Sequence, residues 1–371
     1  MCQGHLRISG KEREEMYNIC VKAGKEAYEI IQDGGFNLDK VAAYFAPAGG
    51  PRWLVAGGFD LALMQSGLLG KNKPVLLVGS SAGAMRFAAW LQPEAAESYR
   101  KFMAAYIAMP FGRKDSPARV FDALSAVINA YVEDDALPFV LSDRRYRLAV
   151  ITARARYLLA SDVKWIQRAG LGLCFLMNGL SRSYLDGFVE RVVFYTGAKP
   201  PDFCFRKGFA GRYVALNEVN FKQAVMASGA IPLAISGVRD IYGAPGGVYR
   251  DGGLIDYHLT HRYGVKKGEV TLFFHHQERI IPGWLDKRIT SRKPADDSLN
   301  NVLMVYPAPE FIAKLPGGRI PDRTDFLTFI NDPQQRMDNW RQAAKQAAPL
   351  GEEFLELIAS GKIKAVTEKL N

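Results

Sequence analysis

The chain has 371 residues, of which 48% are hydrophobic and 23% are charged. This balance is typical of a globular protein with a large core, and it excludes long disorder and fibrous or low-complexity architecture. Lys and Arg outnumber Asp and Glu by 48 to 38, which gives a formal net charge of +10. The excess favours anionic partners, including acidic lipid surfaces. No aromatic RNA-binding motif or zinc-finger spacing is present, so we expect no nucleic-acid partner.

The N-terminal residues lack the continuous apolar region of a secretory signal, and no apolar run is long enough to span a bilayer. We therefore expect a cytosolic protein without a transmembrane segment. The cysteines are scattered without a C-x-x-C pair, at Cys2, Cys20, Cys174 and Cys204. This spacing predicts reduced thiols rather than disulfides or a metal site, and no motif predicts a cofactor.

A glycine-rich turn follows the first predicted core strand. Residues 12–31 have the apolar spacing of a packing helix, and the apolar run 41–46 predicts the strand. The strand leads into Gly49 and Gly50, just before another predicted helix. Backbone N–H groups in such a turn can stabilise an oxyanion, so these glycines are the candidate donors. Alternatively, the glycines only permit a tight turn.

The stretch 74–90 predicts a strand, a sharp turn and a helix. Gly79, Ser81 and Gly83 form the pattern G-x-S-x-G between an apolar run and small residues at helical spacing. In a nucleophile elbow, the glycines let strand and helix approach closely and the serine is held in a strained turn with its oxygen exposed. Ser81 is therefore the candidate nucleophile. The alternative is a structural strand-to-helix turn.

Downstream, strands alternate with helices, which predicts a three-layer α/β fold. The expected strands are 147–152, 188–196, 269–275 and 302–306, with a hairpin near residues 241 and 248; the expected helices are 99–109, 118–132, 163–180, 221–228 and two after residue 333. We divide the chain into a helical N-terminal extension (1–40), a main domain (41–310) and a helical C-terminal extension (311–371) packed on the same domain.

Two further segments contain candidate functional residues. Asp251 ends a predicted strand and precedes Gly252 and Gly253, although an Asp-Gly pair alone is most often a turn. The segment 279–293 mixes apolar residues with cations, namely Ile280, Ile281, Trp284 and Leu285 with Arg279, Lys287, Arg288, Arg292 and Lys293. That mixture is typical of a membrane interface, but it also fits a solvated loop with a few anchoring apolar residues.

Together, the Gly-Gly-x-Arg turn, the G-x-S-x-G elbow and the late Asp-Gly-Gly resemble the patatin-like phospholipase family. The resemblance covers residues 41–261 and includes the segment 224–232, AVMASGAIP. It implies a three-layer α/β/α fold with a central mixed sheet, in which 41–310 is the catalytic domain. It also implies a lipid acyl hydrolase that meets its substrate peripherally at a membrane or micelle interface, anionic lipid included, without a metal or cofactor.

The same resemblance implies roles for individual residues. Ser81 is the nucleophile, Asp251 is the general base, and no histidine takes part. Gly49 and Gly50 form the oxyanion hole, and the remaining motif residues are Arg52, Gly79, Gly83, Gly252 and Gly253.

The chain departs from the family pattern around the glycine turn and after Asp-Gly-Gly. Ala48 and Trp53 stand where the family has glycines, and the ring of Trp53 is expected to narrow the acyl site. The family's asparagine and proline after Asp-Gly-Gly are also missing, and Asp256 and Tyr257 occupy that region.

Two other functions fit the sequence. Ser81, Asp251 and either His275 or His276 occur in the chain order of a Ser-Asp-His α/β-hydrolase. A protein that has lost activity through the altered glycine turn would instead bind a lipid or a partner without catalysis. A serine-directed probe distinguishes these alternatives.

Overall fold

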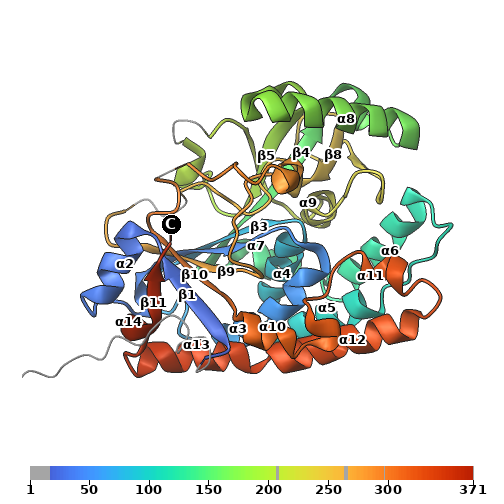
Figure 1. Ribbon diagram of the computed structural model, residues 1–371. Helices are drawn as coiled ribbons and strands as arrows, with labels where there is room; N and C mark the ends of the chain where they lie inside the picture. The colour runs from blue at the N-terminus through green and yellow to red at the C-terminus, as the bar shows by residue number, and fades with distance from the viewer. Residues whose placement is uncertain (1–16, 206–208, 263–265, 296, 371) are drawn as a thin grey trace, which may run out of the picture.

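The computed structural model describes residues 17–205, 209–262, 266–295 and 297–370. Within these ranges eleven strands form one sheet in the order β11-β1-β10-β9-β2-β3-β4-β5-β6, with β8 paired to β4 and β7 paired to β8 (Figure 1). The strands are β1 (Ile19–Ala23), β2 (Val41–Ala46), β3 (Val75–Ser80), β4 (Tyr146–Ala155), β5 (Val189–Tyr195), β6 (Arg212–Ala215), β7 (Val238–Arg239), β8 (Val248–Asp251), β9 (Val270–Phe274), β10 (Val302–Pro307) and β11 (Thr367–Lys369).

The centre of the sheet is parallel. Strands β10, β9, β2, β3 and β4 each run parallel to their neighbours, whereas β1 is antiparallel to β10, and β5 and β8 are antiparallel to β4. Because the carboxyl ends of neighbouring parallel strands meet at one edge, the turns after β2 and β3 lie side by side there. Open α/β sheets commonly bind ligands at this edge.

Helices cover the sheet, and a large apolar core lies beneath one face. Figure 1 shows α12 and α13 along the bottom of the molecule and α8 at the top. The helices are α2 (Lys25–Gln32), α3 (Gly57–Ser66), α4 (Ala82–Trp90), α5 (Ala95–Ala108), α6 (Pro117–Asn129), α7 (Leu137–Ser142), α8 (Lys164–Leu180), α9 (Phe221–Ser228), α10 (Pro309–Ala313), α11 (Asp325–Thr328), α12 (Pro333–Ala347), α13 (Pro349–Ala359) and α14 (Ile363–Val366). The protein is therefore an α/β protein with a large, mostly parallel mixed sheet flanked by helices.

The core on one face packs side chains of α3, α4, α5, α12 and α13 against the sheet. On the opposite face, Phe45, Val78 and Phe273 of the central strands are covered by side chains from irregular segments, such as Phe203 and Leu259. Most predicted elements are confirmed, including the first core strand, the elbow strand and the helix over 221–228.

The predicted N-terminal helix is wrong over Ile19–Ala23, which forms strand β1. This strand pairs with β10 and β11, so residues far along the chain determine its conformation. Residues 12–16 of the predicted helix lie outside the described residues, and only α2 keeps the helical conformation. The N-terminal region thus contributes a strand to the main sheet rather than a helical extension.

No helix in the described ranges combines the length and apolar character that crossing a bilayer requires.

Candidate active site

Ser81 occupies the junction between β3 and α4. Its backbone angles are φ 56° and ψ −124°, a conformation that is strained for a residue with a side chain. The Ser81 N–H donates to Ser228 Oγ at 2.8 Å, and Ser228 Oγ in turn donates to the Ile151 carbonyl at 2.7 Å. These bonds hold the turn in place, so the Ser81 hydroxyl is directed by a fixed backbone.

The glycines of the elbow are required by close packing. A Cβ on Gly83 would lie 1.8 Å from the Ala46 carbonyl oxygen, and one on Gly79 would lie 2.6 Å from Ala84 Cα. The first turn of α4 therefore rests directly on the end of β2. Any larger residue at either position would push the serine away from the glycine turn that follows β2.

A buried ion pair fixes α4 from below. Arg86 donates to both carboxylate oxygens of Asp60, through Nε at 2.7 Å and Nη2 at 2.8 Å. Tyr44 and Tyr99 also donate to Asp60. Because both members of the pair are fully buried and hydrogen-bonded, this cluster locks the helix that carries Ser81.

Asp251 lies at the end of β8, directly opposite Ser81. The Ser81 Oγ donates to Asp251 Oδ2 at 2.6 Å, and the Gly253 N–H donates to Asp251 Oδ1 at 2.7 Å. Burial raises the pKa of Asp251 to about 6, against the opposing effects of the Ser81 hydroxyl and the Gly253 amide. A carboxylate with this pKa is ionised at neutral pH and is a better base than an ordinary aspartate.

The glycine turn places two backbone N–H groups at the same cavity. Gly49 and Gly50 line it together with Ser81, and Gly50 has a positive φ of 56°. Among the described residues no protein group accepts a hydrogen bond from either N–H, whereas the Ala48 N–H donates to the Tyr257 carbonyl at 2.9 Å. Both groups are therefore available to an external oxyanion.

The expectation that Trp53 narrows the acyl site is wrong. Its ring is buried, stacks on Phe102 with centroids 4.4 Å apart, and meets the edges of Tyr99 and Tyr106. The side chain points into the core beneath the sheet, where it anchors the segment that follows the glycine turn.

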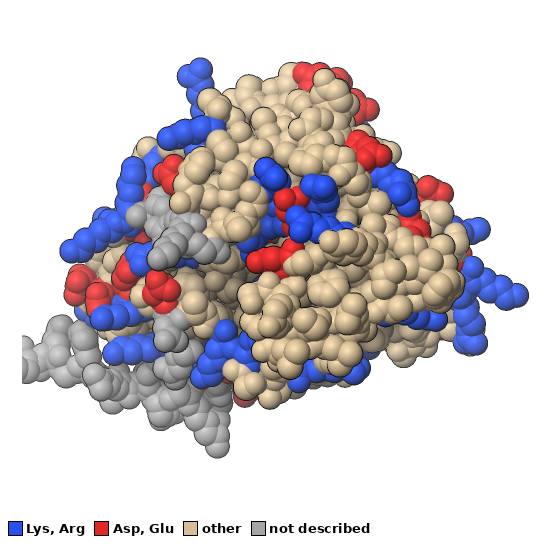
Figure 2. All heavy atoms as spheres, turned by 90° about the horizontal axis from the view of Figure 1, so that it is seen from above, with Lys and Arg blue, Asp and Glu red and all other residues tan. Residues whose placement is uncertain are grey.

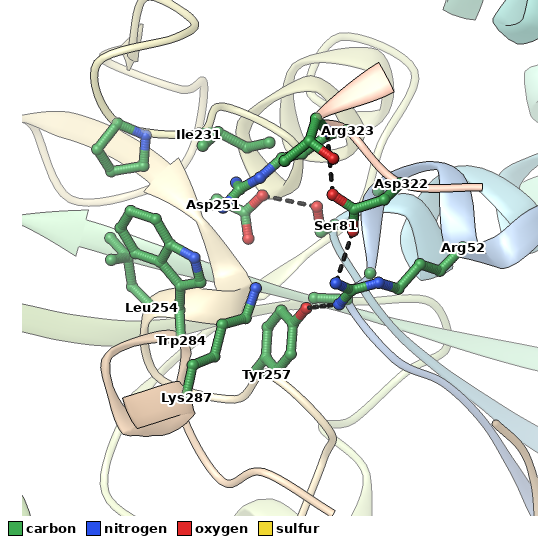
Figure 3. A pocket seen from close by; sticks show the side chains of 15 residues that line it. Arg52, Ser81, Ile231, Asp251, Leu254, Tyr257, Trp284, Lys287, Asp322 and Arg323 are labelled. Atoms are coloured by element: carbon green, nitrogen blue, oxygen red, sulfur yellow. Dashed lines mark hydrogen bonds and ion pairs between the residues drawn. The ribbon is translucent and has the colours of Figure 1, made fainter. Parts of the chain in front are cut away.

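A polar cavity of about 230 Å³ opens in front of Ser81. Figure 3 shows Ser81 and Asp251 at its base, with Arg52, Lys287 and Arg323 around them. Arg52 forms an ion pair with Asp322 at 2.6 Å and donates to the Tyr257 hydroxyl at 3.3 Å. In the space-filling view, blue and red spheres gather around a hollow within a largely tan surface (Figure 2).

An apolar cavity of about 390 Å³ adjoins the polar one and also reaches Ser81. Its walls include Met85, Tyr106, Phe111 and Leu124. Ser81 thus lies where two adjoining spaces meet, one mainly apolar and one with several charged side chains, and Trp284 and Arg323 line both.

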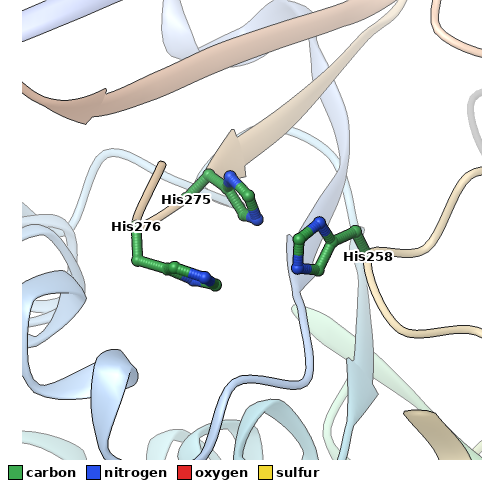
Figure 4. A group of neighbouring side chains, drawn as sticks. All are labelled: His258, His275 and His276. Carbon is green, nitrogen blue, oxygen red and sulfur yellow. The ribbon is translucent and has the colours of Figure 1, made fainter. Parts of the chain in front are cut away.

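Three histidines cluster beside the glycine turn. The ring centroid of His258 lies 4.2 Å from that of His275 and 5.4 Å from that of His276 (Figure 4). Burial lowers the pKa of all three, to about 3 for His275, so the imidazoles are neutral. Within the described part of the chain, none of the three is hydrogen-bonded to Ser81 or Asp251. The geometry of a Ser-Asp-His triad is therefore absent from these residues.

The nitrogen atoms of these three histidines that could bind a metal ion lie within 4.8 Å of one another. His275 Nδ1 donates to the Gln277 carbonyl, which leaves its Nε2 with a free lone pair. His258 Nδ1, however, accepts from the Ile281 N–H at 2.9 Å, so its Nε2 carries the proton. A metal ion could use all three rings only if His258 gave up that backbone hydrogen bond.

The segment 279–293 forms a wall of the site rather than an exposed apolar loop. Ile280 and Ile281 are buried, which contradicts the expected membrane-facing cluster. Trp284 lines both cavities, and Lys287 lines the polar one. Sequence composition alone could not distinguish a pocket wall from an interface, because both mix aromatic and cationic side chains.

The structure brings Ser81, Asp251, Gly49, Gly50 and Arg52 together at one cavity. Gly79, Gly83, Gly252 and Gly253 shape the backbone around it. Sequence analysis did not assign Asp322, Arg323 or His258 to the site, because they come from distant loops without a linear motif. It named Lys287 as part of a membrane interface, and His275 or His276 as the base of an alternative Ser-Asp-His triad. No family model matches the chain, and no match was found among the curated proteins.

Proposed function

We propose that the protein is a lipid acyl hydrolase with a Ser-Asp dyad and a three-layer patatin-like architecture. The observation that carries the proposal is the 2.6 Å hydrogen bond from Ser81 Oγ to Asp251 Oδ2. It joins a strained serine to a carboxylate of raised pKa, which is the pairing that an activated nucleophile requires.

In the proposed reaction, Ser81 Oγ attacks the acyl carbonyl carbon while Asp251 Oδ2 accepts the hydroxyl proton. The negative charge that develops on the carbonyl oxygen is stabilised by the Gly49 and Gly50 N–H groups. As the intermediate collapses, Asp251 returns the proton to the departing alcohol, and an acyl ester of Ser81 remains. Water then attacks this ester, with Asp251 again acting as the base, and releases the fatty acid.

The apolar cavity supports an acyl substrate. Its volume lies within the range of roughly 300–1,000 Å³ that is common for ligand pockets. Because the cavity begins at Ser81, a bound hydrocarbon chain would place its ester carbon at the nucleophile.

The histidine environments favour the dyad over a Ser-Asp-His triad. His275 and His258 each use Nδ1 in a bond to the backbone, and burial keeps both rings neutral. Such rings are structural partners of the loops that hold them, whereas a triad base must reach the serine.

A fluorophosphonate probe tests the proposal directly. The purified protein should be labelled on Ser81 and should hydrolyse soluble short-chain esters, and Ser81→Ala should abolish both. Ser80→Ala is the matched control, because Ser80 is a buried neighbour whose hydroxyl has no hydrogen-bond partner among the described residues. A folded parent protein that neither reacts with the probe nor cleaves esters would support a non-catalytic binding protein instead.

A further inference from the structure

We propose that Lys287 and Arg323 bind a phosphate on the alcohol half of the substrate, so that the preferred substrate is an acyl ester of a small phosphorylated alcohol. This inference rests on the proposed function and specifies which ester that function acts on.

The polar cavity contains more cations than carboxylates can neutralise. Asp322 already pairs with Arg52 at 2.6 Å, and Asp251 is committed to Ser81. No carboxylate in the described ranges forms an ion pair with Lys287 or Arg323. Arg52, Lys287 and Arg323 thus outnumber the two carboxylates of the cavity, Asp251 and Asp322, and neither Lys287 nor Arg323 has a carboxylate in ion-pair contact within the described ranges.

Both cations are held by aromatic rings. Lys287 Nζ lies 4.3 Å from the ring centroid of Tyr257, and the Arg323 guanidinium lies 5.5 Å from that of Trp284. Figure 3 shows the Lys287 ammonium group directed toward the space around Asp251 and Tyr257. Ring contacts orient the cations without neutralising them, so their hydrogen-bond donors stay available to a ligand.

The environment of Lys287 also favours a bound anion. Burial, together with the nearby Arg323 and Arg52, lowers the pKa of Lys287 to about 7. An anion placed between these groups would relieve the repulsion and keep the lysine charged. A phosphate between Lys287 and Arg323 would supply the negative charge that the two carboxylates of the cavity do not provide.

The position of the cations indicates which half of the ester they contact. The two cavities meet at Ser81, and Arg323 lines both of them, whereas Lys287 lines the polar one and not the apolar one. The apolar cavity accounts for the acyl chain, so the polar cavity, with both cations at its wall, remains for the alcohol. At about 230 Å³ the polar cavity is smaller than most ligand pockets, so it fits a compact alcohol rather than a second hydrocarbon chain.

The test compares two soluble esters with the same acyl chain, one of glycerol and one of glycerol phosphate. The parent should favour the phosphorylated ester in kcat/KM, and Lys287→Gln and Arg323→Gln should each reduce that preference about 10- to 100-fold, the worth of one charged hydrogen bond. Arg288→Gln is the control, because it removes an exposed charge from the same turn that does not line the cavity. An unchanged preference in both site variants, or a parent without a preference, would overturn the inference and leave the proposed function intact.

Inorganic phosphate distinguishes a substrate group from a free ligand. It should inhibit hydrolysis of the glycerol ester competitively in the parent and more weakly in Lys287→Gln. Inhibition by free phosphate without a preference for the phosphorylated ester would overturn the substrate assignment. Broadening of the phosphorus NMR line of inorganic phosphate reports its binding without turnover. If the line is not broadened by a catalytically active parent, the anion site is refuted and the proposed hydrolase function is not.

A second inference concerns the outer face of α8. We infer that this helix inserts into the surface of an anionic membrane. Its inner residues Gly170, Leu171 and Cys174 are buried, but its solvent side presents Trp165, Leu173, Leu176 and Leu180. The exposed fractions reach 72% for Trp165 and 77% for Leu180.

Such an outer face is unusual for a helix in water, where charged residues normally cover it. The sequence of α8 contains Lys164 and Arg168 and no acidic residue, which complements an anionic surface. Figure 1 shows α8 at the edge of the molecule opposite α12 and α13.

The helix is also coupled to the polar cavity. Asn178 on α8 donates to Asp286 at 2.8 Å, and Asp286 precedes Lys287 in the turn that lines the site. Insertion of α8 would therefore bring the cavity close to the lipid surface.

Flotation with phosphatidylcholine vesicles, with and without phosphatidylserine, tests this assignment. Replacing Leu173, Leu176 and Leu180 together by Gln should weaken binding to the mixed vesicles at least about tenfold, and salt should weaken binding by the parent. Leu68→Gln with Phe139→Gln is the control, because both are exposed hydrophobic residues on other elements. Parent-like binding by the triple variant would contradict the inference. So would a parent that ignores vesicles but forms a dimer, measured by light scattering, that the triple variant loses.

Discussion

Asp251 and Asp256 lie in one short segment, and both are buried, but their surroundings differ. Asp256 accepts two hydrogen bonds from Arg191, at 2.6 and 2.9 Å, and a third contact with His261 at 3.1 Å. Burial alone would raise its pKa, but Arg191 and His261 outweigh burial and hold the pKa far below its usual range. Among the residues that the structure describes, no cation is in hydrogen-bond contact with Asp251, and burial raises its pKa to about 6.

The comparison shows that two carboxylates in one segment can have different roles, one structural and one reactive, because their hydrogen-bond partners differ. Asp256 is fully compensated, so it holds the loop and remains ionised at any physiological pH. Asp251 accepts hydrogen bonds from a hydroxyl and an amide, and the nearby Arg323 and Lys287 offset its burial only in part, so it stays able to take a proton. Asp256 thus stabilises the loop that follows Asp251, the proposed base.

Removing the carboxylate of Asp251 should give the largest effect. Asp251→Asn eliminates the proposed base, so we expect kcat/KM for a soluble ester to fall roughly 10²- to 10⁴-fold. Because the folded pKa of Asp251 exceeds the unfolded one, its contribution to stability is present below the unfolded pKa and lost as pH rises through about 6. Above that pH the neutral variant should unfold at the same or a higher temperature than the parent. Full activity in Asp251→Asn would refute the dyad.

Breaking the Asp256 contacts should instead reduce stability. Asp256→Asn removes the carboxylate charge that pairs with the largely buried Arg191, so we expect a loss of about 3–5 kcal/mol in the free energy of unfolding. Denaturant titration measures this loss. The control is Asp338→Asn, whose partner Arg341 is half-exposed and whose pair contributes at most about 1 kcal/mol. Equal losses in the two variants would show that Asp256 is not a structural anchor.

Asp251 should determine the acidic limb of the pH dependence of hydrolysis. Since only the ionised carboxylate accepts a proton, kcat/KM for an uncharged ester should rise through pH 6 and be about tenfold lower at pH 5 than on its plateau. Lys287 lowers the pKa of Asp251, so Lys287→Gln should shift this limb to higher pH. The limb is measured over the pH range in which circular dichroism is constant. If it does not move in Lys287→Gln, Lys287 does not influence the pKa of Asp251.

The histidines should give the smallest effect. We expect His275→Gln and His276→Gln each to lower kcat/KM less than tenfold, far below the loss of a general base. The comparison requires variants whose circular dichroism and melting temperature match those of the parent. A folded histidine variant as inactive as Ser81→Ala would establish a triad.

The fold was predictable where local pattern and packing agree. Val41–Ala46 and Phe221–Ser228 have strong local signals and form the expected elements. The segment Ile19–Ala23 was misassigned, because its apolar residues also fit a helix and only pairing with β10 and β11 makes it a strand.

The sequence indicates those residues of the candidate site that lie in a local motif, and not those that tertiary packing brings to it. Ser81 and Asp251 are flanked by Gly79, Gly83 and Gly252, where an added Cβ would collide with neighbouring backbone. The requirement for glycine at these positions is therefore visible in the local sequence. Lys287 and Arg323 carry no such local mark, because they reach the cavity through tertiary packing of loops. Trp284 and Ile281 have similar apolar character, and only the fold separates the pocket wall from the buried core.

The position of β1 between β10 and β11 has a consequence for how the protein is made. The ribosome releases β1 early, but both of its neighbours belong to the final part of the chain. Pairing over such a sequence separation is slow, because the long intervening chain must first be brought into register. Ser81 and Asp251 are therefore synthesised before either neighbour of β1. Strand β1 cannot pair until β10 has been synthesised, and this edge of the sheet is complete only when β11 follows.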